Sequence, residues 1–507
     1  MLKLTKSFYR YLRVVTDKVH VRKFAHLTRK KTCGTEWCSK LALFHTVQVL
    51  RQKTRLRIKV PLLNANDCSK TVQMSKTDST GNNVKHGEVF EIPSDEDQAT
   101  EQWRRKSNDS STRTREQGII PPDFRTWESI QGTGNSCDGS FKFKVVSYNV
   151  LAQCLLEQHR ELYTECSPRN LKWSVRSSRL YDEITKLAPD IICLQEVQAS
   201  HLNNFYYKFE QLGYFGIYKR KTGERKDGCA IYFKQSVFVL EDHISVEFYQ
   251  PLLPILNRDN IGIIIKLVPR CAPGTPIVVA TTHLLYNPRR TDVRLAQLKL
   301  FLAEIDRFSY YNNGAESGHF PTILTGDFNS TPDSAVIKLL EKGHLSRVNA
   351  LRDMSDWERI GVTDHCQHLS VYLNRQKGVA TGFDDVQIFN SDYSVSSPEP
   401  ESGDAPNSPS EFSSMFNSGV IGHSLNFTSA YDKYKKDGQK EASTYQDYWL
   451  TVDYIYFSCC SALRLVERLR LPTDTECEVL GCLPNDVYGS DHLALAALFE
   501  LAPAKTA

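Results

Sequence analysis

The sequence predicts an α/β protein built on mixed β-sheets. From about Phe141 onward, short apolar runs typical of strands alternate with longer stretches of helical periodicity. The chain has 507 residues, of which 40% are hydrophobic, 24% charged and 10% aromatic. This is ordinary globular composition, so it excludes a collagen, a coiled coil and a wholly disordered chain. The length allows one large catalytic domain.

Individual elements follow from these runs in chain order. Strands are predicted at residues 144–148, 190–195, 229–233, 261–268, 277–281, 322–324 and 452–457. Helices are predicted at residues 173–187, 199–212 and 292–307. Since amphipathic helices bury one face on a sheet, the pattern favours sheets with helices packed against them.

The first part of the chain is strongly basic. Residues 1–31 hold ten Lys or Arg against one acid, Asp17, so this segment carries +9 while the whole chain carries +4 and the remainder −5. We expect residues 1–40 to be an amphipathic mitochondrial targeting segment or a basic tail that contacts RNA. These alternatives predict a cytoplasmic or mitochondrial location and also allow the nucleus. Phosphate recognition in the acidic remainder then requires a focused site.

Two polar segments are predicted to lack stable structure. Residues 41–140 form a linker, because most of this stretch is rich in Ser, Thr, Asn, Asp, Lys and Gln and has little periodicity. Residues 390–419 form a disordered insert rich in Ser, Pro and acids. The folded domain is therefore expected at residues 141–501, interrupted by this insert.

Apolar runs and cysteines exclude two further classes of protein. The longest apolar run, residues 261–268, is far shorter than the roughly 20 residues that a membrane span needs. The fourteen cysteines form no CxxC pair, which disfavours a secreted disulfide scaffold. Cys193, Cys229, Cys459 and Cys460 are expected to pack as small hydrophobic residues.

Polar side chains follow the predicted strands, where an α/β scaffold presents its functional loops. They are Asn149, Glu196, His283, Asp327, Asn329, Asp453, Asp491 and His492. Taken singly, each has an ordinary structural explanation, such as a turn cap for Asn149 or a core histidine for His283. Their order along the chain makes the set informative.

That order resembles the signature of the endonuclease/exonuclease/phosphatase superfamily, whose type member is DNase I. The segments VVSYNVLAQ, WSVRSSRLYDEI, DIICLQEVQ, KDGCAIYFK and THLLYNPRRTDVRLAQ resemble the deadenylase-like branch that includes Nocturnin and, most similar, the Angel proteins. The resemblance covers residues 141–501. It implies a DNase I-like four-layer sandwich of two mixed β-sheets flanked by helices.

The predicted metal site uses oxygen ligands. Phosphodiester hydrolysis needs a cation on the phosphoryl oxygens and an activated water. Glu196 and Asn149 supply hard oxygen ligands, which suit Mg²⁺, with Mn²⁺ as the alternative. The resemblance places Asp491 at or near the metal. A Cys/His cluster for Zn²⁺ is not seen in the sequence.

Five residues are predicted to act on the phosphate. Asp327 orients the attacking water or accepts its proton, and Asn329 donates its amide to a phosphate oxygen. His492 and Asp453 form an imidazole–carboxylate pair, in which the acid fixes the tautomer. His283 donates to a phosphate oxygen and stabilises the developing charge.

Substrate contacts are predicted on both sides of the site. Tyr286, Asn287 and Arg289 follow His283, and Tyr448 precedes the Asp453 strand, so they could stack a base or meet a phosphate. Asn149 is a further candidate for substrate binding. The alternative is that the aromatic residues pack the sheet edge and that the arginines face solvent.

Three functions remain at this point. The preferred one is a Mg²⁺-dependent 3′–5′ exoribonuclease of deadenylase type that acts on RNA 3′ ends. The second uses the same site on a terminal 2′,3′-cyclic phosphate. The third is a non-catalytic RNA or translation-factor binding module, which the complete polar set disfavours. Because no leucine-rich repeat array precedes the domain, a separate protein partner would recruit the enzyme.

Overall fold

The computed structural model describes residues 118–130, 139–251, 253–346, 357–376, 414–446 and 448–503, all within one compact unit, Glu91–Ala507. The predictions for residues 1–40, for most of the linker and for most of the insert lie outside these residues. No helix in the described part combines the length and the apolar character that a bilayer span needs.

Two large mixed sheets form the centre of the domain. The seven-stranded sheet has the order β1 (Trp127–Ser129), β18 (Leu463–Leu469), β19 (Leu495–Leu501), β2 (Phe141–Asn149), β3 (Ile191–Gln195), β5 (Gly228–Lys234) and β4 (Tyr214–Arg220). The six-stranded sheet has the order β14 (Phe427–Ser429), β17 (Asp453–Ser458), β11 (Thr322–Asp327), β8 (Ile277–His283), β7 (Ile261–Pro269) and β6 (Phe238–Glu247). All seven predicted strands are present.

Smaller elements complete the described chain. Three two-stranded pairs are β9 (Tyr310–Asn312) with β10 (Ser317–His319), β12 (His344–Ser346) with β13 (Val420–Gly422), and β15 (Thr444–Gln446) with β16 (Tyr448–Leu450). The α-helices are α4 (Gln153–Gln158), α5 (Trp173–Leu187), α6 (Tyr207–Gln211), α7 (Thr291–Ser309), α8 (Ala335–Lys342), α10 (Trp357–Ile360) and α11 (Leu369–Gln376). Short helical turns are η2 (Arg160–Tyr163), η3 (Ala199–His201), η4 (Leu202–Tyr206), η5 (Pro254–Leu256) and η7 (Glu476–Leu480).

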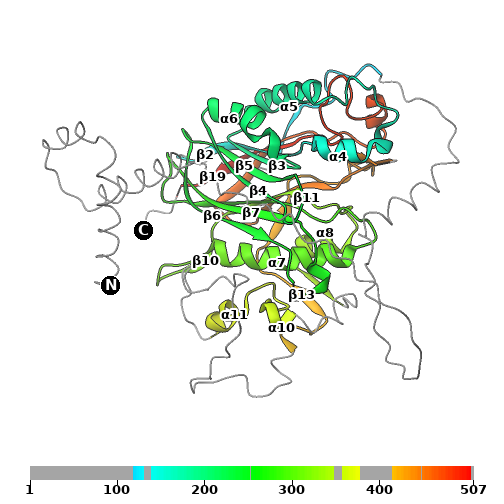
Figure 1. Cartoon of the computed structure of the whole chain (residues 1–507). Helices are drawn as coiled ribbons and strands as arrows, with labels where there is room; N and C mark the ends of the chain where they lie inside the picture. The colour runs from blue at the N-terminus through cyan, green and yellow to red at the C-terminus, as the bar shows by residue number, and fades with distance from the viewer. Residues whose placement is uncertain are drawn as a thin grey trace, which may run out of the picture. The chain divides into compact units, whose positions relative to one another are not determined.

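Alternating side chains of the central strands build three apolar cores. Val145 of β2 and Val279 of β8 point into the core between the two sheets. Their neighbours point outward, Val146 into a core beneath α5 and Val278 into a core beneath α7. Strands buried on both faces read as continuous apolar runs, which explains why the sequence revealed them. Figure 1 shows the resulting helix, sheet, sheet and helix layers, so the predicted four-layer sandwich is confirmed.

Helix α7 is buried on almost all sides. One side faces the six-stranded sheet, and α10 and α11 lie against the other side (Figure 1). Lys299 of α7 donates to Asp364 at 2.8 Å, and its ammonium group lies 4.2 Å from the ring centre of Trp357. The other oxygen of Asp364 accepts from the backbone N–H and the hydroxyl of Ser418. This buried network joins residues 357–376 and the end of the predicted insert to α7.

The structure corrects three sequence predictions. The folded domain begins before Phe141, because β1 pairs with β18; this strand of three residues has no apolar pattern and depends on its partner. The helix predicted at residues 199–212 consists of η3, η4 and α6. Cys459 and Cys460 are exposed, because they follow the end of β17, whereas Cys193 and Cys229 are buried as expected.

The packing at the end of the insert can be tested at Phe416, which is buried in the core beneath α7. Replacing Phe416 by Ala should lower the free energy of unfolding by about 3 kcal/mol, because a large apolar side chain is lost. Val420→Ala, at an exposed position in the same segment, should cost no more than about 0.5 kcal/mol. Urea unfolding measures both values, and equal losses would contradict the packing.

Candidate active site

The predicted polar residues meet at one edge of the sandwich. Strands β2 and β3 are parallel, and so are β8 and β11, so each pair ends at the same edge of its sheet. Asp327 at the end of β11 is in register with His283 at the end of β8. The antiparallel strand β17 begins there, with Asp453 opposite Asp327. Strand direction and register therefore bring together residues that lie far apart in the sequence.

Asn149 connects the two sheets at this edge. Its Nδ2 donates to Glu196 at 3.0 Å, in the loop after β3, and to Asp327 at 3.0 Å, in the other sheet. Its Oδ1 accepts from the backbone N–H of Leu151. The side chain thus lies as a donor between two carboxylates, and its Oδ1 keeps one lone pair, so the metal-ligand role of Asn149 stays a prediction.

Two site residues adopt left-handed backbone conformations. Glu196 has φ +58° and Asn329 has φ +47°, which costs a non-glycine residue roughly 1 kcal/mol or more. Around Asn329 the cost is offset by two hydrogen bonds. Its backbone N–H donates to Asp327 at 2.9 Å, and its Nδ2 donates to the carbonyl of Leu284 at 3.0 Å. Nδ2 has a second hydrogen, so the predicted donation to a phosphate oxygen remains chemically available.

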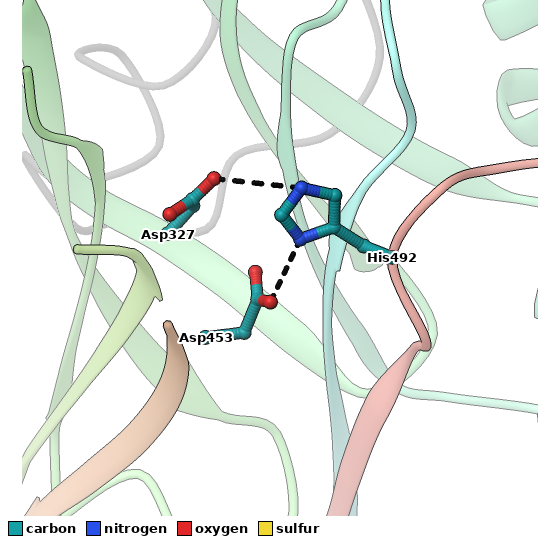
Figure 2. Close-up of side chains that lie close together, drawn as sticks. All are labelled: Asp327, Asp453 and His492. Carbon is teal, nitrogen blue, oxygen red and sulfur yellow. Dashed lines mark hydrogen bonds and ion pairs between the residues drawn. The ribbon is translucent and has the colours of Figure 1, made fainter. Parts of the chain in front are cut away.

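His492 lies between two buried carboxylates (Figure 2). Its Nδ1 is 2.8 Å from Asp453 Oδ2, and its Nε2 is 3.8 Å from Asp327 Oδ2. The hydroxyl of Ser443 donates to the same Asp453 oxygen at 2.7 Å. Asp453 therefore orients the imidazole toward Asp327, as the predicted imidazole–carboxylate pair requires.

Burial and neighbouring charges adjust the pKa values of this group. Burial, followed by the negative charge of Asp453, raises the pKa of Asp327 to about 7. Burial alone would lower the pKa of His492, but Asp453 and the neighbouring acids raise it well above its ordinary value. Burial, together with Lys221 and His492, lowers the pKa of His283 well below its ordinary value. At neutral pH the site thus holds a protonated His492 and a neutral His283 beside Asp327, whose pKa lies close to neutrality.

Glu196 and Asp491 form the part of the site that best fits a divalent cation. Burial raises the pKa of Glu196, and the charges of Asp491 and Asp227 raise it further. Glu196 accepts from the backbone N–H of Ala152 at 2.9 Å, and Asp491 accepts from the hydroxyl of Tyr163 at 2.7 Å. Two neighbouring acids with oxygen donors suit a hard cation such as Mg²⁺.

A second group offers converging ligand atoms. Asp327, Asp453 and His492 each place one such atom within 4.8 Å of the others, the one His/Cys/Asp/Glu group of this kind among the described residues. Because Nδ1 of His492 is engaged with Asp453, these residues serve better as an acid–base group. Both groups thus present oxygen or nitrogen atoms that can coordinate a metal ion.

Arg176 is a functional residue that sequence analysis missed. From α5 it donates to the carbonyl of Gly489 at 2.8 Å and to the carbonyls of Val150 and Leu151 at 2.8 and 2.6 Å. It therefore joins the loop after β2 to the loop that carries Asp491. Its segment contributed to the family resemblance, but a helical arginine has no local signal for burial.

Lys221 is a second residue that was missed. Its ammonium group lies 2.8 Å from a carboxylate oxygen of Asp227, and both side chains are nearly buried. Burial would lower the pKa of Lys221, but Asp227 and Glu196 raise it. The pair places a buried positive charge close to Glu196.

The predicted substrate residues differ in their surroundings. Tyr286 and Tyr448 are 41% and 61% exposed, and Arg289 is also exposed. Tyr448 lies on the hairpin of β15 and β16, which reaches His492 through a bridge at Thr444. Asn287 is instead buried, and its side chain accepts from the backbone N–H of Arg289 at 3.0 Å. Asn287 therefore supports a turn through its side-chain oxygen, whereas Tyr286, Arg289 and Tyr448 are exposed to solvent, and the predicted substrate roles of all four stay predictions.

Comparisons with known proteins agree with this geometry. Residues 146–492 match the Endonuclease/Exonuclease/phosphatase family. Protein angel homolog 1 of Rattus norvegicus is 34% identical over 444 residues, covering 75% of this chain but only 66% of its own length. Protein angel of Drosophila melanogaster is 34% identical over 390 residues, 74% of this chain and 86% of its own. The crystal structure of ANGEL2, a 2′,3′-cyclic phosphatase, has a TM-score of 0.60 and 32% identity, covering 76% of this chain and 99% of that one.

The chain belongs to the endonuclease/exonuclease/phosphatase family, as the resemblance of its sequence predicted. Within it, the similar proteins are Angel proteins, so the resemblance to the Angel branch is confirmed as well. The chain spans just under two thirds of the length of the rat relative.

The metal assignment can be tested at Glu196. Glu196→Ala should abolish turnover at saturating Mg²⁺, because the proposed metal ligand is lost. Thermal stability should stay near that of the parent, because the lost carboxylate is repelled by the neighbouring acids and contributes little to core packing. Glu157→Ala, which shortens an exposed acid on α4, is the matched control and should keep full activity. Activity of Glu196→Ala near the parent level would contradict the assignment.

The role of Arg176 predicts a different result. Arg176→Met keeps much of the apolar bulk but leaves three backbone carbonyls without their donor. We expect a loss of about 3 kcal/mol in the free energy of unfolding together with a loss of turnover. Arg176→Lys should restore little of the lost stability or turnover, because an ammonium group cannot reproduce the planar arrangement of donors on the guanidinium group. Full rescue by Lys, measured by urea unfolding and kinetics, would show that charge alone matters.

Proposed function

We propose that this chain is a divalent-metal-dependent phosphoesterase that hydrolyses terminal 2′,3′-cyclic phosphates at RNA 3′ ends. The observation that carries the proposal is the similarity to ANGEL2, described as a 2′,3′-cyclic phosphatase and also solved with adenosine-2′,3′-vanadate. That similarity extends over 99% of the solved chain. The buried acid–base group of this chain supports the same chemistry.

Asp327 is the proposed base. Its pKa of about 7 lies near the working pH, where a general base combines a useful ionised fraction with sufficient basicity. Asp327 accepts a proton from the attacking water. Asn149, which donates to the same carboxylate, keeps its oxygens in place.

His492 and His283 are the proposed donors to the phosphate. His492 is protonated at neutral pH and held by Asp453, so it can give a proton to the departing ribose oxygen. His283 is neutral, its Nε2 lies 3.6 Å from Asp327 Oδ2, and its Nδ1 has no hydrogen-bond partner in the described structure. A neutral imidazole can donate to a phosphoryl oxygen without adding a charge to the site.

Glu196 and Asp491 are the proposed holders of the cation, for which we propose Mg²⁺. When bound, such an ion neutralises charge on the phosphoryl oxygens. Tyr163 and the backbone N–H of Ala152 keep these two carboxylates in position.

Shortening of RNA chains, the function first expected from the sequence, stays a prediction. The exposed rings of Tyr286 and Tyr448 favour it, since successive removal of nucleotides requires a grip on the bases beside the scissile phosphate. A non-catalytic binding module is disfavoured because the hydrogen-bonded acid–base group is complete. Recruitment by a protein partner also stays a proposal.

One assay distinguishes the two activities. The protein is incubated with Mg²⁺ and 5′-labelled RNA that ends either in a 2′,3′-cyclic phosphate or in oligo(A) with a free 3′ hydroxyl. We expect the cyclic end to open with no change in chain length, because only the terminal ribose and phosphate need to be held. Progressive shortening of either RNA would instead support the exoribonuclease.

Two variants sharpen this assay. His283→Ala should reduce opening of the cyclic phosphate by roughly 10² to 10³, as expected for the loss of one transition-state donor. Tyr448→Ala should change it little and should mainly raise KM for any chain shortening. Equal, small effects of the two substitutions would contradict the placement of the site.

The pH dependence follows from Asp327. Because the base must be ionised, kcat/KM should fall about tenfold per pH unit below about pH 7. Asp453→Asn removes a charge that raises the pKa of Asp327, so in this slower variant the fall should begin at lower pH. Ser443→Ala keeps the charge of Asp453 and should leave the fall near pH 7. A pH profile that does not move in Asp453→Asn would rule out Asp327 as the titrating group.

A further inference from the structure

Two cysteines outside the acid–base group lie against each other. Cys166 is buried and Cys482 is partly exposed. The sulfur of Cys166 is 3.2 Å from the carbonyl oxygen of Leu483, and the sulfur of Cys482 is 3.4 Å from that of Glu165. Each sulfur therefore lies beside the backbone next to the other cysteine.

The two thiols differ in reactivity. The neighbouring Cys166 lowers the pKa of Cys482 to about 7, whereas the neighbouring Cys482 together with burial raises the pKa of Cys166. At neutral pH much of Cys482 is therefore the thiolate, the nucleophilic form. Cys482 is partly exposed, which gives a small reagent access to its sulfur, and a pocket lined by Tyr163, Cys166 and Leu171 opens on the Cys166 side of the pair.

The pair connects two loops that meet at the metal side of the site. Tyr163, three residues before Cys166, donates to Asp491, nine residues after Cys482, at 2.7 Å. Tyr163 and Cys166 belong to one small apolar cluster, against which Cys482 packs. A change in the distance between the two sulfurs therefore acts on the segment that positions Asp491.

We propose that Cys166 and Cys482 form an oxidisable dithiol, and that their disulfide disturbs the bond from Tyr163 to Asp491 and lowers activity. A disulfide holds its sulfurs about 2 Å apart, closer than two sulfurs that are not bonded to each other. Its formation removes the S–H that Cys166 donates to the carbonyl of Leu483 and draws together the two loops that carry the cysteines. The effect on activity rests on the proposed function, whereas the thiol chemistry does not.

The oxidant is a peroxide. The Cys482 thiolate attacks one peroxide oxygen, which forms an S–O bond, breaks the O–O bond and releases water or an alcohol after uptake of a proton. The sulfur of Cys166 then attacks the sulfenic acid, which forms the S–S bond and breaks the S–O bond. Hydroxide leaves and takes the Cys166 proton as water. Two thiols and one hydrogen peroxide thus become one disulfide and two waters.

The chemical test uses the full chain, reduced, desalted and treated with hydrogen peroxide near stoichiometry. Free thiols are then blocked, and a digest without reductant is analysed by mass spectrometry. We expect a peptide linked through Cys166 and Cys482, and we expect dimedone to label Cys482 in Cys166→Ser. Cys271→Ser, at an exposed cysteine elsewhere, is the control and should still form the link. A protein oxidised only at other cysteines, with no such link, would overturn the proposal.

The functional test compares hydrolysis of the cyclic phosphate before and after oxidation. We expect activity to fall about tenfold or more in the parent, to recover with dithiothreitol and to stay constant in Cys166→Ser. Unchanged activity in a protein with the disulfide formed would overturn the effect on Asp491. If the reduced protein does not hydrolyse the substrate at all, the proposed function fails, while the mapped disulfide still decides the thiol chemistry.

Discussion

A single amide group, that of Asn149, fixes the two sheets relative to each other at the site. Its Nδ2 donates at 3.0 Å to Glu196 beside one sheet and at 3.0 Å to Asp327 in the other. The two hydrogens of an amide lie in one plane at a fixed angle, so both bonds form only in a narrow range of sheet positions. The geometry of the site therefore depends on how the core between the sheets is packed.

The site brings several acidic side chains together where burial makes the ionised form of a carboxylate unfavourable. Asp327 is buried and Glu196 is partly buried, and neighbouring acids raise the pKa of each. Buried cations offset part of this cost: His492 between two carboxylates, Lys221 near Glu196, and Arg176 in the loops. The same burial that makes these acids unfavourable brings the pKa of Asp327 close to neutrality, where it can transfer protons. Stability and reactivity thus have one physical origin here.

The sequence revealed the helices with a clear period and the strands that are buried on both faces. Helix α5 begins and ends at the predicted residues, and β7 and β8 appeared as continuous apolar runs. Strands with weaker patterns were missed. Strand β1 has no apolar pattern and β6 alternates at the sheet edge, so pairing with β18 and β7 defines them. Local patterns report burial, whereas edge strands depend on the neighbour that completes their hydrogen bonds.

By itself, the sequence determined the fold class and the family, and it indicated which polar residues follow the strands. Tertiary structure decided what each of them does. It turned the amide of Asn149 into a donor between the sheets, assigned Asn287 to a turn, and brought Arg176 to the carbonyls of the site loops. The roles of Asn149 and Arg176 depend on contacts between segments that are up to 313 residues apart in the chain. No local pattern encodes such distances, because they follow from the packing of the two sheets against each other.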